Sequence, residues 1–410
     1  MKVEQGATLK LKDLNEDLEV GDGSRIVSLS DSGFSVISGY VKCRGRVEFD
    51  GNFQCGDFSG DHCRVTIGAL RCDDLGMDDG ELLVSGDLKA RDIDIDKRLV
   101  VSGKTEADDI EVGGVLELSS VFSRSINVGG KFRSSSEVVV DSIEVGGVVR
   151  IDGMIKARDL EVGGKVSLAG GEISGKIDVG GLFETSKPLK FGEIDVGGVA
   201  RLVGPSSGSD VDVGGKFIVD GDISFRGLDI GGVAEIRGNA DGLSVEIGGK
   251  LSVDKALTLK GDLEVGGVMS IGGDVEARYV EIGGSGSAVS ISIESAEFSG
   301  EVKTERGVFA SRSIEVSRGC RIKGPIRCQG EVIIESRAEV ESISAPRIKI
   351  EDKAKALNLY GEDIEVEDRS EVLGEVLYTR SVRSGERTRF AKPPLKVDSI
   401  PEELGWQHSK

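Results

Sequence analysis

Apolar and polar residues alternate along most of the chain in short phrases that recur with a fixed period. Each phrase has the form aliphatic-acid-aliphatic, with asparagine once replacing the acid, and precedes a glycine pair, as in Leu160-Glu161-Val162-Gly163-Gly164. Eight of the ten steps between successive pairs are 17 residues long, one is 16 and one is 18. The first glycines of the eleven pairs are Gly113, Gly129, Gly146, Gly163, Gly180, Gly197, Gly214, Gly231, Gly248, Gly266 and Gly283. A short, strict period without a helical pattern inside it indicates a strand-rich coil repeated many times, which is typical of a solenoid.

One repeat contains three strand-like phrases. The repeat Leu160–Lys176 alternates at Leu160 and Val162 and again at Val166 and Leu168. Other repeats have a fuller third strand, with apolar pairs at Ile155 and Ala157, Leu189 and Phe191, and Ile223 and Phe225. Alternation at period two predicts strands with one buried face. Three such strands bury their apolar residues when they coil into a triangle, and we expect the glycine pairs at a corner, where glycine tolerates φ > 0.

The repeat frame sets the predicted domain organisation. We expect an all-β fold, a triangular β-helix or β-solenoid with about 17 residues per turn and about 20 turns over residues 41–378. Residues 1–40 lose the 17-residue frame and are predicted to form irregular N-terminal turns or a cap. Residues 379–410 are predicted to form a basic, proline-containing C-terminal tail.

Charge limits the partners of such a solenoid. The formal net charge is −20, and residues 378–410 hold seven basic and four acidic residues, so the remainder carries −23. Such a body repels nucleic acid, and we expect no nucleic-acid partner. The polar N-terminus has no apolar signal run, and no apolar stretch is long enough to span a membrane. We therefore expect a cytoplasmic protein without a transmembrane segment.

The middle residue of each aliphatic-acid-aliphatic phrase is predicted to face solvent, and stacking brings these residues into one column. Neighbouring carboxylates in water repel by just under about 1 kcal/mol before salt screening. The column is either a solvated face that discourages lateral aggregation or a template for cations or a basic partner. Its candidate acidic residues are Glu111, Glu144, Glu161, Asp178, Asp195, Asp212, Asp229, Glu246, Glu264 and Glu281, with Asn127 at one position.

A second outward column lies two residues after the first glycine of each pair. An exposed aliphatic stripe is a candidate contact surface for another protein or another copy of the chain, although lysines interrupt it. The candidate lateral interface is therefore Val115, Val148, Leu182, Val199, Val233 and Val268, interleaved with Lys131, Lys165, Lys216 and Lys250. Plain tolerance of apolar residues at the surface is the alternative.

The C-terminal tail is the third candidate surface. It is basic and extended and contains the only tryptophan, Trp406. It is either disordered, docked on the acidic body, or bound to a partner through Trp406 and Leu404. Its candidate contacts are Arg380, Arg383, Arg387, Arg389 and Trp406.

Catalytic chemistry is not evident in the sequence. His62 and His408 are the only histidines, and the carboxylates lie in columns without a partnered acid or base. No phosphate-binding glycine motif is present. The six cysteines form no CxxC pair; they are read as small buried side chains in preference to a metal site at Cys55, His62, Cys63 and Cys72 or a disulfide. We expect no enzyme activity, no cofactor and no metal.

Several phrases resemble those of bactofilins. Gly153-Met154-Ile155-Lys156-Ala157-Arg158-Asp159-Leu160 and Gly273-Asp274-Val275-Glu276-Ala277-Arg278-Tyr279-Val280 are similar to the G-D-I-x-A-x-x-V phrase of that family, as is Ser85–Ile93. The resemblance covers most of residues 41–378 and is one of repeat units, because any triangular β-solenoid selects similar phrases. It implies a right-handed triangular β-helix that polymerises end to end without nucleotide into a cytoskeletal filament. The repeat region is several times longer than a typical bactofilin core.

The sequence supports two main functional hypotheses. The first is a non-enzymatic, bactofilin-like structural protein that self-assembles, end to end or laterally, into a filament or scaffold. The second is a capped β-solenoid module for binding or assembly within a larger complex, similar in architecture to the glycine-rich β-helix domains of glutamate synthase and formylmethanofuran dehydrogenase. A carbohydrate-acting solenoid enzyme would require a cleft with clustered Asp, Lys and Arg. Polar caps at both ends would favour the module, and an open apolar end would favour polymerisation.

Overall fold

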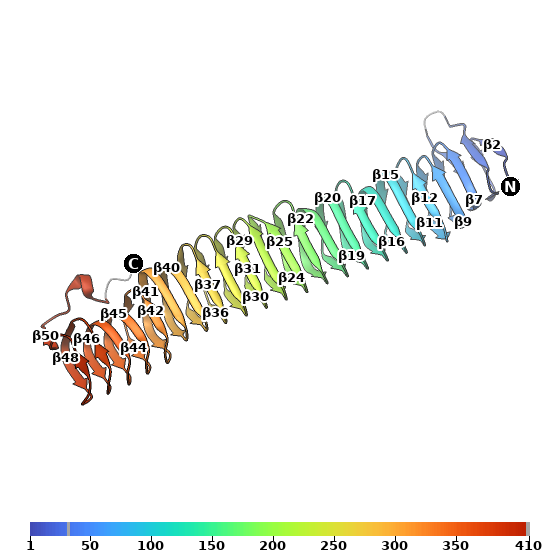
Figure 1. Cartoon of the computed structure of the whole chain (residues 1–410). Coiled ribbons are helices and arrows are strands. Elements are labelled where there is room, and N and C mark those ends of the chain that lie inside the picture. Colours follow the sequence, from blue (N-terminus) through green and yellow to red (C-terminus); the bar gives the residue numbers. More distant parts are fainter. Residues whose placement is uncertain (31–32, 407–410) are drawn as a thin grey trace. The chain divides into compact units, whose positions relative to one another are not determined.

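The computed structural model describes residues 1–30 and 33–406. Contacts divide the chain into two compact units, Met1–Val203 and Gly204–Lys410. In Figure 1 the first unit runs from blue to green and the second from yellow-green to red. Each unit is a stack of β-coils, and the described residues contain one further element, the 3-10 helix η1 (Glu402–Leu404).

The first unit contains 25 strands. They are β1 (Lys2–Val3), β2 (Thr8–Leu11), β3 (Asp13–Leu14), β4 (Leu18–Val20), β5 (Arg25–Ser28), β6 (Ser35–Ile37), β7 (Val41–Asp50), β8 (Phe53–Gln54), β9 (Phe58–Ile67), β10 (Leu70–Arg71), β11 (Asp74–Asp78), β12 (Glu81–Val84), β13 (Leu88–Lys89), β14 (Asp92–Ile95), β15 (Arg98–Glu106), β16 (Asp109–Val112), β17 (Val115–Val128), β18 (Lys131–Ser134), β19 (Val138–Val145), β20 (Val148–Ala157), β21 (Asp159–Val162), β22 (Lys165–Val179), β23 (Leu182–Thr185), β24 (Leu189–Val196) and β25 (Val199–Val203).

The second unit also contains 25 strands. They are β26 (Ser206–Ser207), β27 (Asp210–Val213), β28 (Lys216–Asp220), β29 (Ile223–Ser224), β30 (Gly227–Ile230), β31 (Val233–Ile236), β32 (Ala240–Gly242), β33 (Ser244–Ile247), β34 (Lys250–Val253), β35 (Leu257–Leu259), β36 (Asp262–Val265), β37 (Val268–Ile271), β38 (Asp274–Glu276), β39 (Tyr279–Ile282), β40 (Ser285–Phe298), β41 (Glu301–Val316), β42 (Arg321–Lys323), β43 (Ile326–Cys328), β44 (Glu331–Ile334), β45 (Glu339–Ile350), β46 (Lys355–Val366), β47 (Glu371–Val372), β48 (Val376–Ser384), β49 (Arg389–Phe390) and β50 (Leu395–Lys396).

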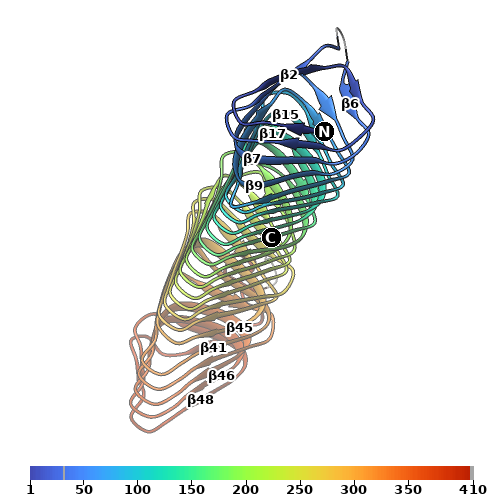
Figure 2. The same ribbon diagram turned by 90° about the vertical axis from the view of Figure 1, so that its right-hand side faces the viewer.

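Each coil has three sides, which we name in chain order. The first side carries the aliphatic-acid-aliphatic phrase, the second follows the glycine pair, and the third completes the turn, as Figure 2 shows along the coils. Every side pairs in parallel with the same side of the next coil. On the first side Leu160 lies opposite Ile177, on the second Val166 lies opposite Phe183, and on the third Gly171 lies opposite Leu189. Parallel pairing at this repeat length confirms the predicted all-β solenoid.

The inward side chains of the three sides form the core. Exposure alternates along most strands, and the inward aliphatic and aromatic residues of the inner coils are almost completely buried; Phe132, Phe183 and Phe217 have no exposed surface. In the N-terminal coils Phe49 packs edge-on against Phe53 and Phe58, with ring centroids 5.2 and 5.6 Å apart. The two units contain about 23 coils of about 17 residues. This exceeds the predicted 20 because residues before 41 and after 378 also form paired strands.

The glycine pairs lie at the corner between the first and second sides, but the predicted reason for glycine there is wrong. The described glycines with positive φ do not include any of the eleven pairs. Instead, a Cβ at Gly180 would lie 2.4 Å from the carbonyl oxygen of Gly163 one coil earlier, and a Cβ at Gly181 would lie 2.6 Å from that of Gly164. The amide of Gly180 donates to the Val162 carbonyl at 3.0 Å, so the hydrogen-bonded ladder continues through the corner. Glycine is needed because successive coils stack too closely for a side chain.

In the coils nearer the two chain termini, the same corner contains a single residue in the left-handed backbone region, with positive φ. In the first unit these residues are Gly6, Gly23, Gly45, His62 and Asp79. In the second unit they are Gly319, Arg337, Lys353 and Arg369. A non-glycine residue in this region costs about 1–2 kcal/mol. A small residue is buried directly after each of the last four, namely Cys320, Ala338, Ala354 and Ser370.

Replacing Ile223 with Asp tests the inward assignment of the third side. Ile223 is 1% exposed, so the substitution buries an unpaired charge. We expect the free energy of unfolding to fall by about 3–5 kcal/mol, measured by denaturant titration with circular dichroism. Ser224→Asp is the matched control, because Ser224 is exposed on the same strand. Equal stability of the two variants would contradict the assignment.

Replacing Gly180 with Ala tests the stacking explanation for the glycine pairs. We expect a loss of about 1–3 kcal/mol in unfolding free energy, because the new methyl group overlaps a backbone carbonyl. Gly76→Ala is the control, since nothing lies within 4 Å of a Cβ placed there. That control should be neutral or more stable by about 0.5–1 kcal/mol. Thermal unfolding of both variants measures these changes. A Gly180→Ala variant as stable as the unmodified chain would refute the stacking explanation.

Candidate interaction surfaces

The predicted acidic column lies on the first side, facing out of the coils. In the first unit Glu144 pairs in register with Glu161, and Asp178 with Asp195. The column begins one coil before the predicted Glu111, because Asp94 lies opposite it. Lys176 partly neutralises the column, since its ammonium lies 3.0 Å from a carboxylate oxygen of both Asp178 and Asp195. These hydrogen bonds raise the pKa of Lys176, so it remains charged at neutral pH.

The column in the second unit lacks such compensation over several coils. Glu246, Glu264 and Glu281 lie opposite one another in successive coils, and all are exposed. Partial desolvation and the neighbouring carboxylates raise the pKa of Glu264. Glu297 and Glu315 continue the column beyond the predicted residues, and the pKa of Glu315 is raised for the same two reasons. Asp212 and Asp229 precede this stretch in register.

Among residues 1–30 and 33–406, no three His, Cys, Asp or Glu side chains are arranged to hold a metal ion. All six cysteines are free thiols, five of them buried and Cys72 half-buried. Burial raises the pKa of Cys63 to about 11.

The predicted lateral column lies on the second side and faces outward. Val148 and Val268 are exposed, at 39% and 43%, and the remaining aliphatic members are half-buried. Two interleaved lysines form ion pairs with glutamates of the next coil, Lys165 with Glu184 at 3.0 Å and Lys216 with Glu235 at 2.9 Å. The side is therefore a mixture of single apolar residues and ion pairs, and its role in lateral contact stays a prediction.

Arginine–aspartate ion pairs link successive coils at the corner between the third side of one coil and the first side of the next. Arg91 contacts Asp74 at 2.6 Å, and Arg226 contacts Asp210 and Arg278 contacts Asp262. Arg91 and Arg278 belong to the Ala-Arg phrases used for the bactofilin resemblance, but their role as contacts between coils was not predicted.

A candidate cleft lies on the third side of the second unit. This groove of about 410 Å³ is lined by Asp274, Ser290, Arg306 and Phe309, among others. The Asp274 carboxylate accepts a hydrogen bond from the Ser290 hydroxyl at 2.6 Å and pairs with Arg306. Both contacts lower the pKa of Asp274. Because its carboxylate therefore stays ionised, Asp274 is better suited to link neighbouring coils than to transfer a proton.

The predicted tail divides into two chemically different parts. Residues 380–396 carry six basic residues and one acidic residue and build the last coil. Arg380 lies 3.0 Å from carboxylates of Glu362 and Asp363, and Arg389 lies 3.4 Å from Glu371. Arg383 lies opposite Glu365 on the first side, and Arg387 is exposed at the corner. Residues 397–406, which we call the strap, carry three acidic residues and no basic ones.

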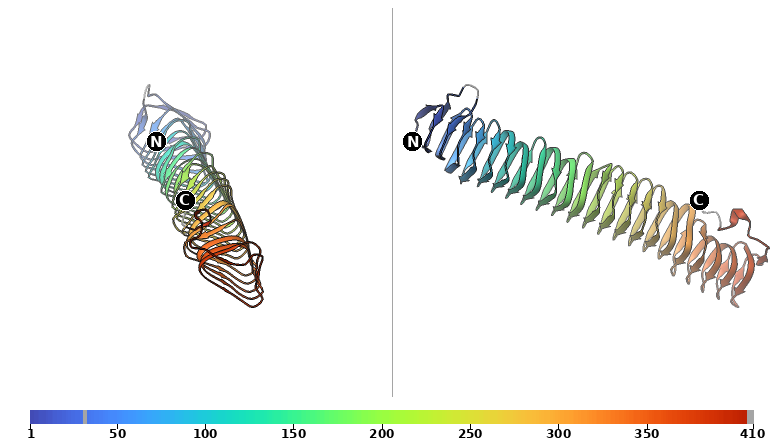
Figure 3. Two further views of the ribbon diagram at one scale, coloured as in Figure 1. Left: turned by 90° about the vertical axis from the view of Figure 1, so that its left-hand side faces the viewer. Right: turned by 180° about the vertical axis from the view of Figure 1, so that it is seen from behind.

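The strap folds back over the third side of the C-terminal coils, as Figures 1 and 3 show. A guanidinium nitrogen of Arg327 donates to the carbonyl oxygen of Glu403 at 3.1 Å. Leu404 and Trp406 are half-buried, and a cavity of about 440 Å³ remains between the strap and residues Glu362 and Thr379. The basic part of the tail thus contacts acidic residues of the preceding coil through Arg380 and Arg389. The acidic strap also lies against the coils, through the hydrogen bond from Arg327 to Glu403, which was not predicted.

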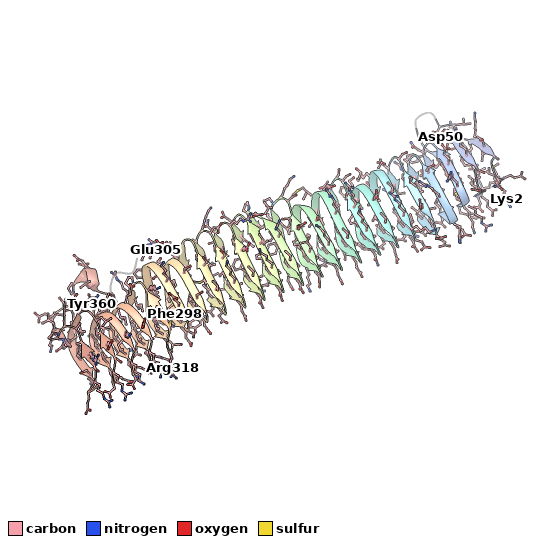
Figure 4. The ribbon with its side chains drawn as sticks, viewed as in Figure 1. Lys2, Asp50, Phe298, Glu305, Arg318 and Tyr360 are labelled. Carbon is pink, nitrogen blue, oxygen red and sulfur yellow. The ribbon has the colours of Figure 1, made fainter. Side chains whose placement is uncertain are left out.

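The strap changes the exposure of the surface beneath it. Outward residues of the third side are exposed in the preceding coils, at Ser224, Asp241, Thr258 and Glu276. In the same column Ser344 is 3% exposed and Tyr360 is 6% exposed. Figure 4 shows Tyr360 among the C-terminal coils. Burial and a 2.9 Å hydrogen bond from the Tyr360 hydroxyl to the Glu375 carboxylate raise the pKa of Tyr360 to about 12.

The terminal coils have unpaired edges within the described residues. β1, β2 and β3 each pair with one strand, and so do β49 and β50. Inward residues are less buried here than in the next coil: Leu9 and Leu14 are half-buried, whereas their partners Ile26 and Ile37 are 0% and 1% exposed. At the other edge Val382 and Phe390 are half-buried, whereas their partners Ile364 and Val372 are both 1% exposed.

The described residues contain no helix with the length and apolarity needed to cross a membrane. The fold defines the chain as a parallel β-solenoid. A scan of protein-family models found no match, and searches of curated proteins and of solved structures found no significant match.

Replacing Glu264 with Gln tests repulsion within the uncompensated column. We expect the free energy of unfolding to rise by up to about 1 kcal/mol at neutral pH, because the substitution removes the repulsion between Glu264 and its two like-charged neighbours. Since the folded-state pKa of Glu264 is raised, its charge costs stability above that pKa and costs nothing below the unfolded-state pKa. The gain should therefore vanish as the pH falls through the raised pKa.

Asp178→Asn is the matched control for this prediction, because Lys176 contacts Asp178. It should be neutral or destabilising at neutral pH. Denaturant titrations of both variants at neutral and acidic pH provide the measurement. A destabilised Glu264→Gln would indicate that the column is stabilised by a bound cation or partner.

Proposed function

We propose that the protein is a non-enzymatic structural protein that assembles end to end with copies of itself. The observation that carries this proposal is the pair of unpaired terminal coils. An edge of hydrogen-bonding groups above half-buried apolar residues is a template for another strand. Stacking a second copy on either edge extends the ladder and buries Leu9 and Leu14 or Val382 and Phe390, so no nucleotide is required.

The sides of the coils support a structural role. Apart from the acidic column of the second unit, many of their charges pair within the chain, as in the Arg91–Asp74 pair and the Lys165–Glu184 pair. The groove at Asp274 holds a carboxylate that is already paired. The resemblance of the repeat phrases to those of bactofilins points the same way, toward a cytoskeletal filament or scaffold. A capped module of a larger complex is the alternative, and it would need covers over both edges.

Replacing Phe390 with Asp tests end-to-end assembly. Phe390 is an inward residue of the last coil, and a charge there opposes burial by a second copy. We expect the unmodified chain to form long filaments of uniform width without nucleotide, and the variant to form short or single particles. Negative-stain electron microscopy and light scattering at equal concentration provide the measurement.

Leu373→Asp is the control for a general effect of charge. Leu373 is 57% exposed in the same region but lies outside the strands of the terminal edge. It should assemble as the unmodified chain does. Discrete particles of the unmodified chain would refute end-to-end assembly and favour the module, whereas equal filament lengths for all three proteins would refute the assigned edge.

A further inference from the structure

We propose that Cys55 and Cys72 form a site of oxidative modification, at which a peroxide joins two neighbouring coils by a disulfide. Both residues are free thiols in the first unit, and each directly follows a strand of the third side, β8 or β10. A disulfide between them is a covalent change within one chain. It goes beyond the proposed function, because it does not depend on end-to-end assembly.

The hydrogen-bonded register places the two cysteines directly opposite each other. Strand β8 pairs with β10 so that Gln54 lies opposite Arg71. The ladder continues by one residue, because the amide of Cys55 donates to the Arg71 carbonyl at 2.9 Å. Paired strands lie about 4.8 Å apart, which is within the range of about 4.4–6.8 Å between the Cα atoms of a disulfide. The backbone therefore needs no rearrangement before the two sulfurs bond.

The two side chains lie on the inward face, where their sulfurs meet. Cys55 is 8% exposed, Cys72 is half-buried, and the amide of Cys72 bonds to the next coil just before the buried Ala90. A hydrogen bond between the two thiols, together with burial, raises the pKa of Cys72 above its usual range. The sulfurs are therefore already in contact in the reduced chain.

The other four cysteines are not arranged in this way. Cys43 and Cys63 each lie opposite a glycine of the paired strand. Cys328 lies opposite an alanine, and the Cys320 thiol donates a hydrogen bond to a backbone carbonyl. The stacking of the coils thus selects one pair of thiols out of six.

One equivalent of peroxide is enough to form the bond. Cys72 is the more exposed of the two thiols and meets the oxidant first. Its sulfur attacks the peroxide, the O–O bond breaks, and a sulfenic acid and one water result. The Cys55 sulfur then attacks the Cys72 sulfur; the S–S bond forms, the S–O bond breaks, and a second water leaves. The two thiols lose two electrons and two protons, and the peroxide is reduced.

The surroundings of the pair favour a slow reaction and a durable product. The thiolate is the attacking species, so the raised pKa of Cys72 slows oxidation at neutral pH. Asp57 and Asp73 also raise this pKa, and their negative charges oppose the approach of anionic thiols that would reduce the disulfide. The pair is therefore suited to record sustained oxidation rather than a brief pulse.

The disulfide would fasten two coils close to the N-terminal edge. The two cysteines are 17 residues apart, so the bond closes one complete coil. A cross-link of this kind stabilises a fold mainly by restricting the unfolded chain. Unfolding that begins at the N-terminal edge could then no longer separate these two coils.

The experiment treats the full chain with hydrogen peroxide under native conditions, blocks the remaining thiols, and analyses tryptic peptides without reduction by tandem mass spectrometry. We expect a link between Cys55 and Cys72, assigned by fragmentation because Cys63 shares a peptide with Cys55. Exposed Met154 reports the dose, since its conversion to the sulfoxide shows that peroxide has acted. The midpoint of thermal unfolding should rise by about 5–10 °C and return after reduction.

Two alanine variants are the controls. Cys55→Ala should fold, because a small buried residue fits these inward positions, as Ala90 and Ala107 show one and two coils after Cys72. It should lack both the link and the rise in the unfolding midpoint. Cys328→Ala, in the second unit, should retain both.

The outcomes separate this proposal from end-to-end assembly. Oxidised Met154 without a link between Cys55 and Cys72 would overturn the proposal, as would a link from either cysteine to another thiol. A link that leaves thermal unfolding unchanged would overturn the fastening of the two coils. None of these results depends on whether the chain forms filaments.

Discussion

The structure depends on the close approach of successive coils, which is imposed by parallel hydrogen bonding on all three sides. Backbone groups of one coil bond to the next even through the corners, as between Gly180 and Val162. This spacing leaves no room for a side chain at the glycine pairs. It also places carboxylates of the first side directly above one another, and it leaves hydrogen-bonding groups unpaired at the first and last coils. The glycine pairs, the column of surface carboxylates and the unpaired terminal edges therefore all result from the close spacing of the coils.

The repeat made the fold predictable from the sequence. Alternating apolar residues identified the strands, and the 17-residue period identified which strands pair, because register in a solenoid follows the period. The physical role of the glycine pairs was not predictable in the same way. Glycine fits both a left-handed corner and a crowded one, and only the position of the Gly163 carbonyl distinguishes them.

The candidate surfaces were predictable only where they follow the period. The acidic column and the aliphatic column were found by counting, and the structure extends the acidic column to Asp94, Glu297 and Glu315. The docked strap could not be found by counting, because its contact with Arg327 joins residues 76 positions apart. The division of the tail into a basic last coil and an acidic strap is local in sequence, but net charge over the whole tail conceals it.

The stacking register described for the glycine pairs has a consequence for how such a chain changes in evolution. Each coil meets its neighbours through nearly identical backbone contacts, so removing residues 147–163 would bring Gly164 beside Gly146 with every side still in phase. An insertion or deletion of another size must be absorbed at a corner or a bulge, as in the coils of 16 and 18 residues, or it turns inward residues outward in the coils that follow. The chain can therefore lengthen or shorten most easily by whole coils, while the terminal coils and the strap determine what each end can contact.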